Sequence, residues 1–123
     1  MEKMNYIIFG KQKDIAFIQS EGSMIKDTQS ALGLMMSARY EMGCNKLILN
    51  KSCFAGEFFM LSSGLCGEIL QKFVNDQMKA AIAGDFTKYT SKPLRDFIYQ
   101  SNKGRDIFFA SSIEEAVCKL VKK

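Results

Sequence analysis

The 123-residue sequence contains no histidine and no tryptophan, and it has a single proline. Without histidine the chain cannot form a Ser-His or Cys-His nucleophile pair, and it lacks the commonest general base and metal ligand. An enzyme built on this sequence would have to transfer protons with Asp, Glu, Lys, Tyr or Cys. These limits favour a non-catalytic protein over an enzyme.

Closely spaced cysteines are also missing. Cys44, Cys53, Cys66 and Cys118 form no Cys-x-x-Cys pair, and no cluster among them has the spacing of a zinc site. We therefore expect reduced thiols, no metal and no other cofactor.

The sequence has no run of about 20 apolar residues, the length that a membrane span requires. Residues 1–5 also lack the basic and apolar regions of a secretory signal. Hydrophobic residues make up 47% and charged residues 24%, which is ordinary for a globular chain. These features predict a single cytoplasmic domain over residues 1–123.

The chain alternates strand-like and helix-like patterns. Apolar runs at 6–9 and 15–18 surround a polar turn and predict an opening antiparallel hairpin. Further strands are expected at 46–50, 78–84 and 107–110. The predicted order is ββαβαβαβα, an α/β fold with a mixed sheet of about five strands, parallel in its second half, and four helices.

Caps and apolar spacing indicate where the helices lie. The first is expected to follow Asp27, to end at Gly43, and to bury a stripe at three- and four-residue steps: Ala31, Leu32, Met35, Ala38 and Met42. A second helix is expected through 65–73 and a third over 92–102, with its proline in the first turn. Ser112 and Glu115 predict a capping box for the last.

The first candidate site is Ser62-Ser63-Gly64, immediately before the second helix. Free N–H groups and the positive end of a helix dipole favour an anion there, including a phosphate placed on a serine. The alternative is ordinary N-capping, for which serine is a preferred residue.

The second candidate is Asp85 and the loop after it. Asp85 follows a strand that we expect to be parallel, and open α/β sheets bind ligands at the carboxyl ends of such strands. Gly84 permits close approach, and Lys88, Tyr89 and Lys92 supply polar groups. An ordinary helix-entry loop is the alternative, because the segment contains no phosphate-binding P-loop motif.

Positive charge is concentrated between residues 86 and 105. This stretch contains Lys88, Lys92, Arg95, Lys103 and Arg105 against a single Asp96. It predicts either a solvated helix face or a docking surface for an anion or an acidic partner. Nucleic acid is not expected, because the pI of about 8.9 is modest and no recognition motif is present.

Aromatic residues crowd the segment between the third strand and the second helix. Phe54, Phe58 and Phe59 lie within six residues of one another, around Gly56. One interpretation is that this apolar segment forms the interface of a homodimer.

Several segments resemble a small bacterial family known as domain of unknown function 4180. The segments are SARYE (37–41), NK (50–51), SGLCGEILQKF (63–73), GDFTKYTSK (84–92) and LRDFIY (94–99). The resemblance spans most of the chain, and the family implies no established activity.

A more distant resemblance is to the sulfate-transporter and anti-sigma-factor-antagonist (STAS) superfamily and its lipid-binding relatives. Residues 59–65 are similar to the Asp-Ser-Ser-Gly-Leu signature of those domains, with Leu61 in place of the acidic residue. The resemblance implies a STAS-like fold and a phosphorylation site at Ser62. The strand at 104–110 and the capped helix at Ser112 are similar to the end of that fold.

Together these features predict a STAS-like regulatory or binding protein. It would bind a partner protein or a small anionic or lipid-like ligand through Ser62, Ser63 and the basic region. The alternative is a small enzyme that uses Asp85, Lys88 and Tyr89 as acid–base and anion-binding groups.

Overall fold

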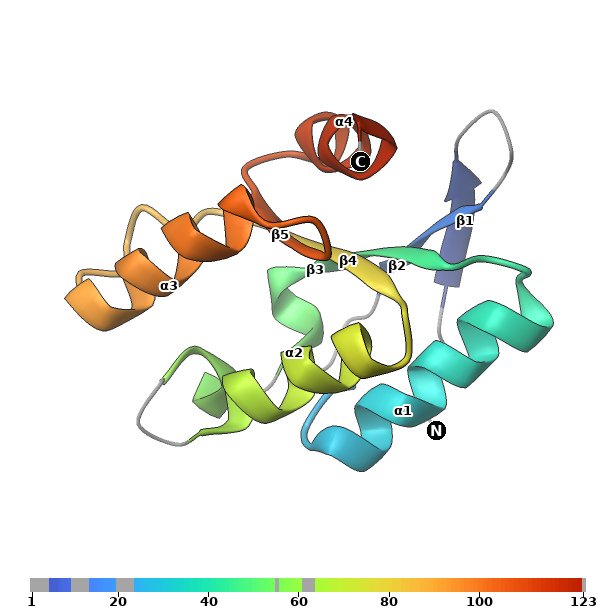
Figure 1. Cartoon of the computed structure of the whole chain (residues 1–123), viewed down its shortest axis with the longest axis horizontal. Coiled ribbons are helices and arrows are strands. Elements are labelled where there is room, and N and C mark those ends of the chain that lie inside the picture. Colours follow the sequence, from blue (N-terminus) through green and yellow to red (C-terminus); the bar gives the residue numbers. More distant parts are fainter. Residues whose placement is uncertain (1–4, 10–13, 20–23, 55, 61–63, 123) are drawn as a thin grey trace.

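The computed structural model describes residues 5–9, 14–19, 24–54, 56–60 and 64–122, and it forms a mixed α/β fold (Figure 1). Its sheet has five strands in the order β1-β2-β3-β4-β5, so neighbours in the sheet are also neighbours along the chain. The strands are β1 (Asn5–Phe9), β2 (Ile15–Gln19), β3 (Lys46–Asn50), β4 (Lys79–Ala83) and β5 (Ile107–Ala110). β1 pairs antiparallel with β2, and β2 to β5 are parallel. The predicted hairpin and parallel half are therefore confirmed.

Four α-helices follow the predicted order. They are α1 (Thr28–Met36), α2 (Leu65–Asn75), α3 (Lys92–Lys103) and α4 (Ile113–Lys122). The first expected helix continues as a π-helical turn, η1 (Ser37–Glu41). Between β3 and α2 the chain forms two 3₁₀ turns, η2 (Lys51–Cys53) and η3 (Gly56–Phe59).

Side-chain caps begin α1 and α4 as the sequence predicts. Asp27 accepts a hydrogen bond from the Ser30 backbone N–H at 2.8 Å, and Ser30 Oγ accepts one from the Asp27 N–H at 3.1 Å. At α4, Ser112 Oγ accepts a hydrogen bond from the Glu115 N–H at 3.1 Å. The Glu115 carboxylate accepts from the Ser111 N–H, one residue earlier than in a standard capping box.

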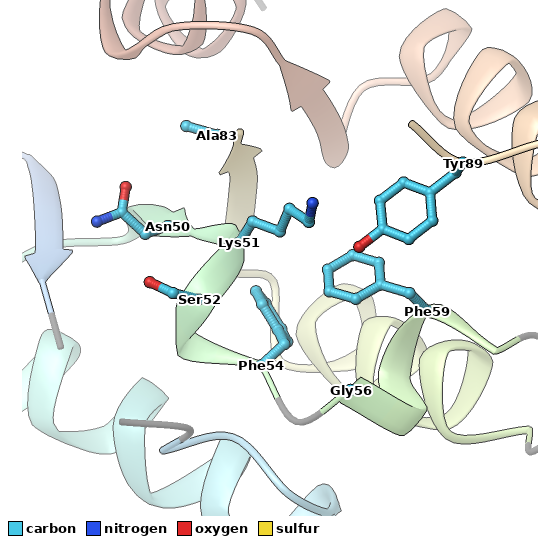
Figure 2. Close-up of a pocket in the computed structure, with 8 residues that line it drawn as sticks. All are labelled: Asn50, Lys51, Ser52, Phe54, Gly56, Phe59, Ala83 and Tyr89. Atoms are coloured by element: carbon cyan, nitrogen blue, oxygen red, sulfur yellow. The ribbon is translucent and has the colours of Figure 1, made fainter. Parts of the chain in front are cut away.

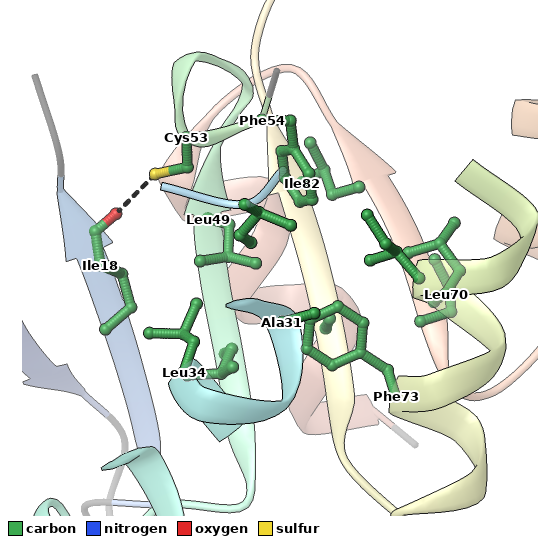
Figure 3. Packing of buried hydrophobic residues seen from close by; sticks show 14 of the residues in the cluster. Ile18, Ala31, Leu34, Leu49, Cys53, Phe54, Leu70, Phe73 and Ile82 are labelled. Carbon is green, nitrogen blue, oxygen red and sulfur yellow. Dashed lines mark hydrogen bonds between the residues drawn. The ribbon is translucent and has the colours of Figure 1, made fainter. Parts of the chain in front are cut away.

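The sheet carries different helices on its two faces (Figure 1). Each parallel connection steps to the next strand in the same direction, so right-handed crossovers place α1, α2 and α3 on one face. The core on that face combines residues of these helices with alternate strand residues such as Ile18, Leu49 and Ile82 (Figure 3). On the other face, Ala116 and Leu120 of α4 pack against a second buried cluster.

The central strand β3 is covered on both faces. Leu47, Ile48 and Leu49 are each fully buried, with Ile48 toward α4 and its two neighbours toward the other helices. This burial explains why the sequence of β3 is a continuous apolar run instead of an alternating one. The polar residues that end the run, Asn50 and Lys51, emerge at the carboxyl edge of the sheet.

Candidate functional site

A pocket of about 500 Å³ opens where β3 and β4 end (Figure 2). Its lining comes from the end of β3 and η2, from η3, from the end of β4, and from the loop after β4. The residues are Asn50, Lys51, Ser52, Phe54, Gly56, Phe59, Ala83 and Tyr89. The pocket therefore lies at the sheet edge where the sequence predicts a ligand site.

Lys51 supplies the positive charge of this pocket. Its Nζ donates a hydrogen bond to the backbone carbonyl of Asp85 at 3.1 Å and lies 4.5 Å from the centre of the Tyr89 ring. The ammonium is thus attracted to the negative face of an aromatic ring (Figure 2). An ammonium has three N–H donors, so two remain for an anion in the pocket.

Gly84 determines the path of the Lys51 side chain. A Cβ atom at position 84 would lie 2.7 Å from Lys51 Cβ and 3.2 Å from Lys51 Cδ. The sequence predicts that Gly84 allows a ligand to approach the backbone, whereas in the structure the lysine stem occupies that space.

Aromatic rings form the inner wall of the site. The rings of Phe59 and Tyr89 are stacked with centroids 5.4 Å apart, and Phe54 and Phe58 are 4.2 Å apart. Phe54 is held in place because the Met24 and Ile25 N–H groups donate to the preceding carbonyl, that of Cys53, at 2.9 Å.

The same phenylalanines were expected as a homodimer interface. Phe58 is fully buried, and Phe54 and Phe59 expose 3% and 9% of their surface. Because they pack into the core of their own chain, they offer a second copy no exposed apolar face.

Asp85 has a local hydrogen-bonding role. Its Oδ1 accepts from the Thr87 N–H at 3.0 Å and from the Thr87 hydroxyl at 2.5 Å. These two bonds, the hydroxyl bond first, hold the pKa of Asp85 below its ordinary value. Asp85 is exposed and stays ionised, which makes it a weak base and a poor proton donor near neutral pH.

The three residues of the enzyme hypothesis are not gathered in one cavity. Tyr89 lines the pocket of Lys51, whereas Asp85 lines a second pocket of about 370 Å³ between α3 and the start of α4. Lys88 is exposed and lines neither of these two pockets.

The second pocket contains one residue of the predicted basic region. Arg95 lines it together with two carboxylates, Asp85 and Glu115. Two other positively charged side chains of this region have partners on α3. Lys92 forms an exposed ion pair with Asp96 at 2.8 Å. Lys103 Nζ lies 4.4 Å from the centre of the Tyr99 ring. The basic region is therefore partly neutralised along α3.

Ser62 and Ser63 lie outside the described residues. Gly64, which follows them, is the N-cap residue of α2 and has a left-handed backbone with φ of 78°. The helix thus begins directly after the serine pair, as predicted, and Gly64 itself provides no side-chain cap.

Within the described part of the chain, no three His, Cys, Asp or Glu side chains are grouped so that they could hold a metal ion. None of the described helices combines the length and apolar character needed to cross a membrane.

Residues 10–120 match the profile of a protein family described as "Domain of unknown function (DUF4180)". The chain belongs to this family. The matched region includes Lys51, Gly84 and Tyr89, so the pocket is part of the DUF4180 domain. No curated protein and no solved structure matches the chain significantly.

Sequence reasoning missed the charged residue of this DUF4180 pocket. Lys51 follows β3 just as Asp85 follows β4, so the strand-end rule that selected Asp85 applies equally to Lys51. The rule was applied only to the end of β4, so the neighbours of Lys51 in the pocket, Asn50 and Ser52, were missed as well.

Proposed function

We propose that this DUF4180 protein is a non-catalytic binding protein that holds a small anion with an apolar body in the pocket of Lys51. The observation that carries the proposal is the position of the Lys51 ammonium, which lies over the Tyr89 ring in the lining of an aromatic-walled pocket.

The lining favours a ligand with one charged end. Phe54, Phe59 and Tyr89 provide an apolar wall, while Lys51 is the charged residue among the lining side chains. The volume of about 500 Å³ falls within the range of small-molecule sites, which are mostly apolar with a few polar groups that orient the ligand. A carboxylate or phosphate on a short aliphatic or aromatic body matches this chemistry.

A regulatory role of STAS type is the finer form of the proposal. It is supported by the order ββαβαβαβα, by a sheet whose strands follow chain order, and by α2 beginning just after Ser62 and Ser63. In this form, phosphorylation of Ser62 would control the binding of a partner protein. Phosphopeptide mapping of protein purified from its own host tests it, and an unmodified Ser62 under all growth conditions would contradict it.

The ionised, exposed state of Asp85 supports binding over catalysis. A general base or acid works best when its pKa lies near the working pH, and the hydrogen bonds from Thr87 move Asp85 in the opposite direction.

The first experiment is calorimetric titration with decanoate, a carboxylate on an aliphatic chain, and with inorganic phosphate. We expect decanoate to bind more tightly than phosphate, because only decanoate also contacts the aromatic wall. Lys51→Met should weaken decanoate binding by about tenfold or more, since a hydrogen bond to a charged group contributes about 1.5–3 kcal/mol.

Lys79→Met is the matched control. Lys79 is a partly buried lysine and the first residue of β4. It therefore lies at the amino end of the strand, whereas the pocket lies at the carboxyl end. This variant should bind decanoate as the wild type does. Equal affinities of the Lys51→Met variant and the wild type, or no binding of either probe, would contradict the proposed function.

A further inference from the structure

The two outermost strands of the sheet, β1 and β5, are covered by the rest of the chain to very different degrees. β5, at one edge, lies between α3 and α4, and its four residues expose between 1% and 6% of their surface. At the other edge, β1 exposes Tyr6 at 46%, Ile7 at 49% and Ile8 at 37%. Within the described residues, β1 is paired only with β2.

Exposed side chains lie on both faces of this edge. Tyr6 and Ile8 stand opposite Ile18 and Ala16, whose side chains belong to the core beneath α1 to α3. Ile7 stands opposite Phe17, which belongs to the core beneath α4. Because directly paired residues share a face, the apolar surface of β1 continues both cores outward.

β1 also lacks the features that usually prevent edge pairing. Its sequence, NYIIF, contains no charged residue, no proline and no glycine. Natural edge strands are commonly blocked by lysine, proline or a bulge, because an open edge is a template for another strand.

We infer that β1 pairs with β1 of a second copy of this chain, antiparallel and about a twofold axis through Ile7. In this register Ile7, the middle residue of β1, lies opposite its own copy, and no charged residue of the strand is placed opposite a like charge. Ile7 then faces Ile7 of the other copy, and Tyr6 faces Ile8, an aromatic–β-branched pair that stabilises sheets. This interface replaces the one expected from Phe54, Phe58 and Phe59, and it does not depend on the proposed ligand.

Light scattering coupled to gel filtration, over a dilution series, measures the assembly. The wild type should elute with twice the chain mass at high concentration, and Ile7→Lys should halve that mass by placing like charges opposite each other. Val121→Lys is the control, because Val121 is likewise an exposed apolar residue (58% exposed) but belongs to α4 instead of β1. A monomeric wild type, or a dimer that persists in Ile7→Lys, would overturn the inference.

Cysteine cross-linking tests the register in case Ile7→Lys disturbs folding. In a Cys118→Ser background, which removes the exposed native thiol, Ile7→Cys should form a disulfide-linked dimer under mild oxidation. Directly opposed residues in antiparallel strands have Cβ atoms about 4.5–5.5 Å apart, close to the range that a disulfide bridges. Val121→Cys should remain monomeric. Equal cross-linking of both variants, or none with Ile7→Cys, would overturn the pairing about Ile7.

Discussion

At the scale of single residues, the site depends on the contact between Gly84 and Lys51. The Lys51 stem passes so close to position 84 that its first side-chain carbon would meet any added Cβ at 2.7 Å. The atom in the way is attached directly to the Lys51 backbone, so rotation of the lysine side chain cannot relieve the overlap.

Gly84→Ala should therefore destabilise the protein by about 1–3 kcal/mol, the usual cost of inserting a methyl group into a packed contact. It should also weaken decanoate binding, because the Lys51 ammonium would be displaced from Tyr89. Urea unfolding and calorimetry measure the two effects.

Gly33→Ala provides the comparison for this substitution. Gly33 lies in α1, where an added Cβ meets nothing within 4 Å, so alanine should stabilise the helix by about 0.5–1 kcal/mol. If Gly84→Ala were as stable as wild type, the contact with Lys51 would not constrain the site.

A second residue-scale prediction concerns the fully buried thiol of Cys66. Burial raises the pKa of Cys66 from the usual 9.0 to about 12. Above pH 9 the thiol of the unfolded chain ionises while the folded one stays protonated, so the free energy of unfolding should fall as pH rises toward 12. Urea unfolding at increasing pH should show a shallower fall in Cys66→Ala than in wild type. Identical slopes would argue against this contribution.

These residues also show what sequence can and cannot reveal about a site. Asp85 and Tyr89 were found because they follow a recognisable strand. The bond from Lys51 to the Asp85 carbonyl joins residues 34 positions apart and arises only when β3 and β4 pair in register. Such a contact has no local signal.

At the scale of elements, α4 has a special place because it covers the sheet face opposite α1 to α3. Its residues Ala116 and Leu120 are fully buried against the sheet, and its first turn is held by Ser112 and Glu115. Its cap therefore affects a whole layer of the core.

Ser112→Ala should lower stability by about 1 kcal/mol, because the Glu115 N–H loses its acceptor. Thermal and urea unfolding measure this loss. Ser101→Ala, within the last turns of α3, is the control and should change stability by less than about 0.5 kcal/mol. A Ser112→Ala variant as stable as this control would show that the cap is dispensable.

The elements themselves were largely predictable. Apolar spacing and caps located the strands and helices, with β4 one residue shorter at each end than expected. The sequence did not predict the π-helical turn at Ser37–Glu41 or the 3₁₀ turns at Lys51–Cys53 and Gly56–Phe59. These turns share local apolar patterns with α-helix, and tertiary packing of residues such as Ala38 and Phe58 decides between them.

At the scale of the whole molecule, strand order links the fold to the site. Alternating strands and helices predicted a parallel sheet with helices on its faces. The sequence did not predict that β3 pairs with β4. The position of Lys51 beside Gly84 follows from that pairing, so it could be recognised only once the strand order was known. The crossover rule then explains why three helices share one face.

The same strand order matches the direction of protein synthesis. Each strand from β2 onward pairs with the strand that left the ribosome just before it, so every new βα unit can pack onto a surface that already exists. New strands are then added on one side of the sheet only, and this addition ends when α3 and α4 cover β5. β1 is synthesised before the other four strands and lies at the side of the sheet that this growth never reaches.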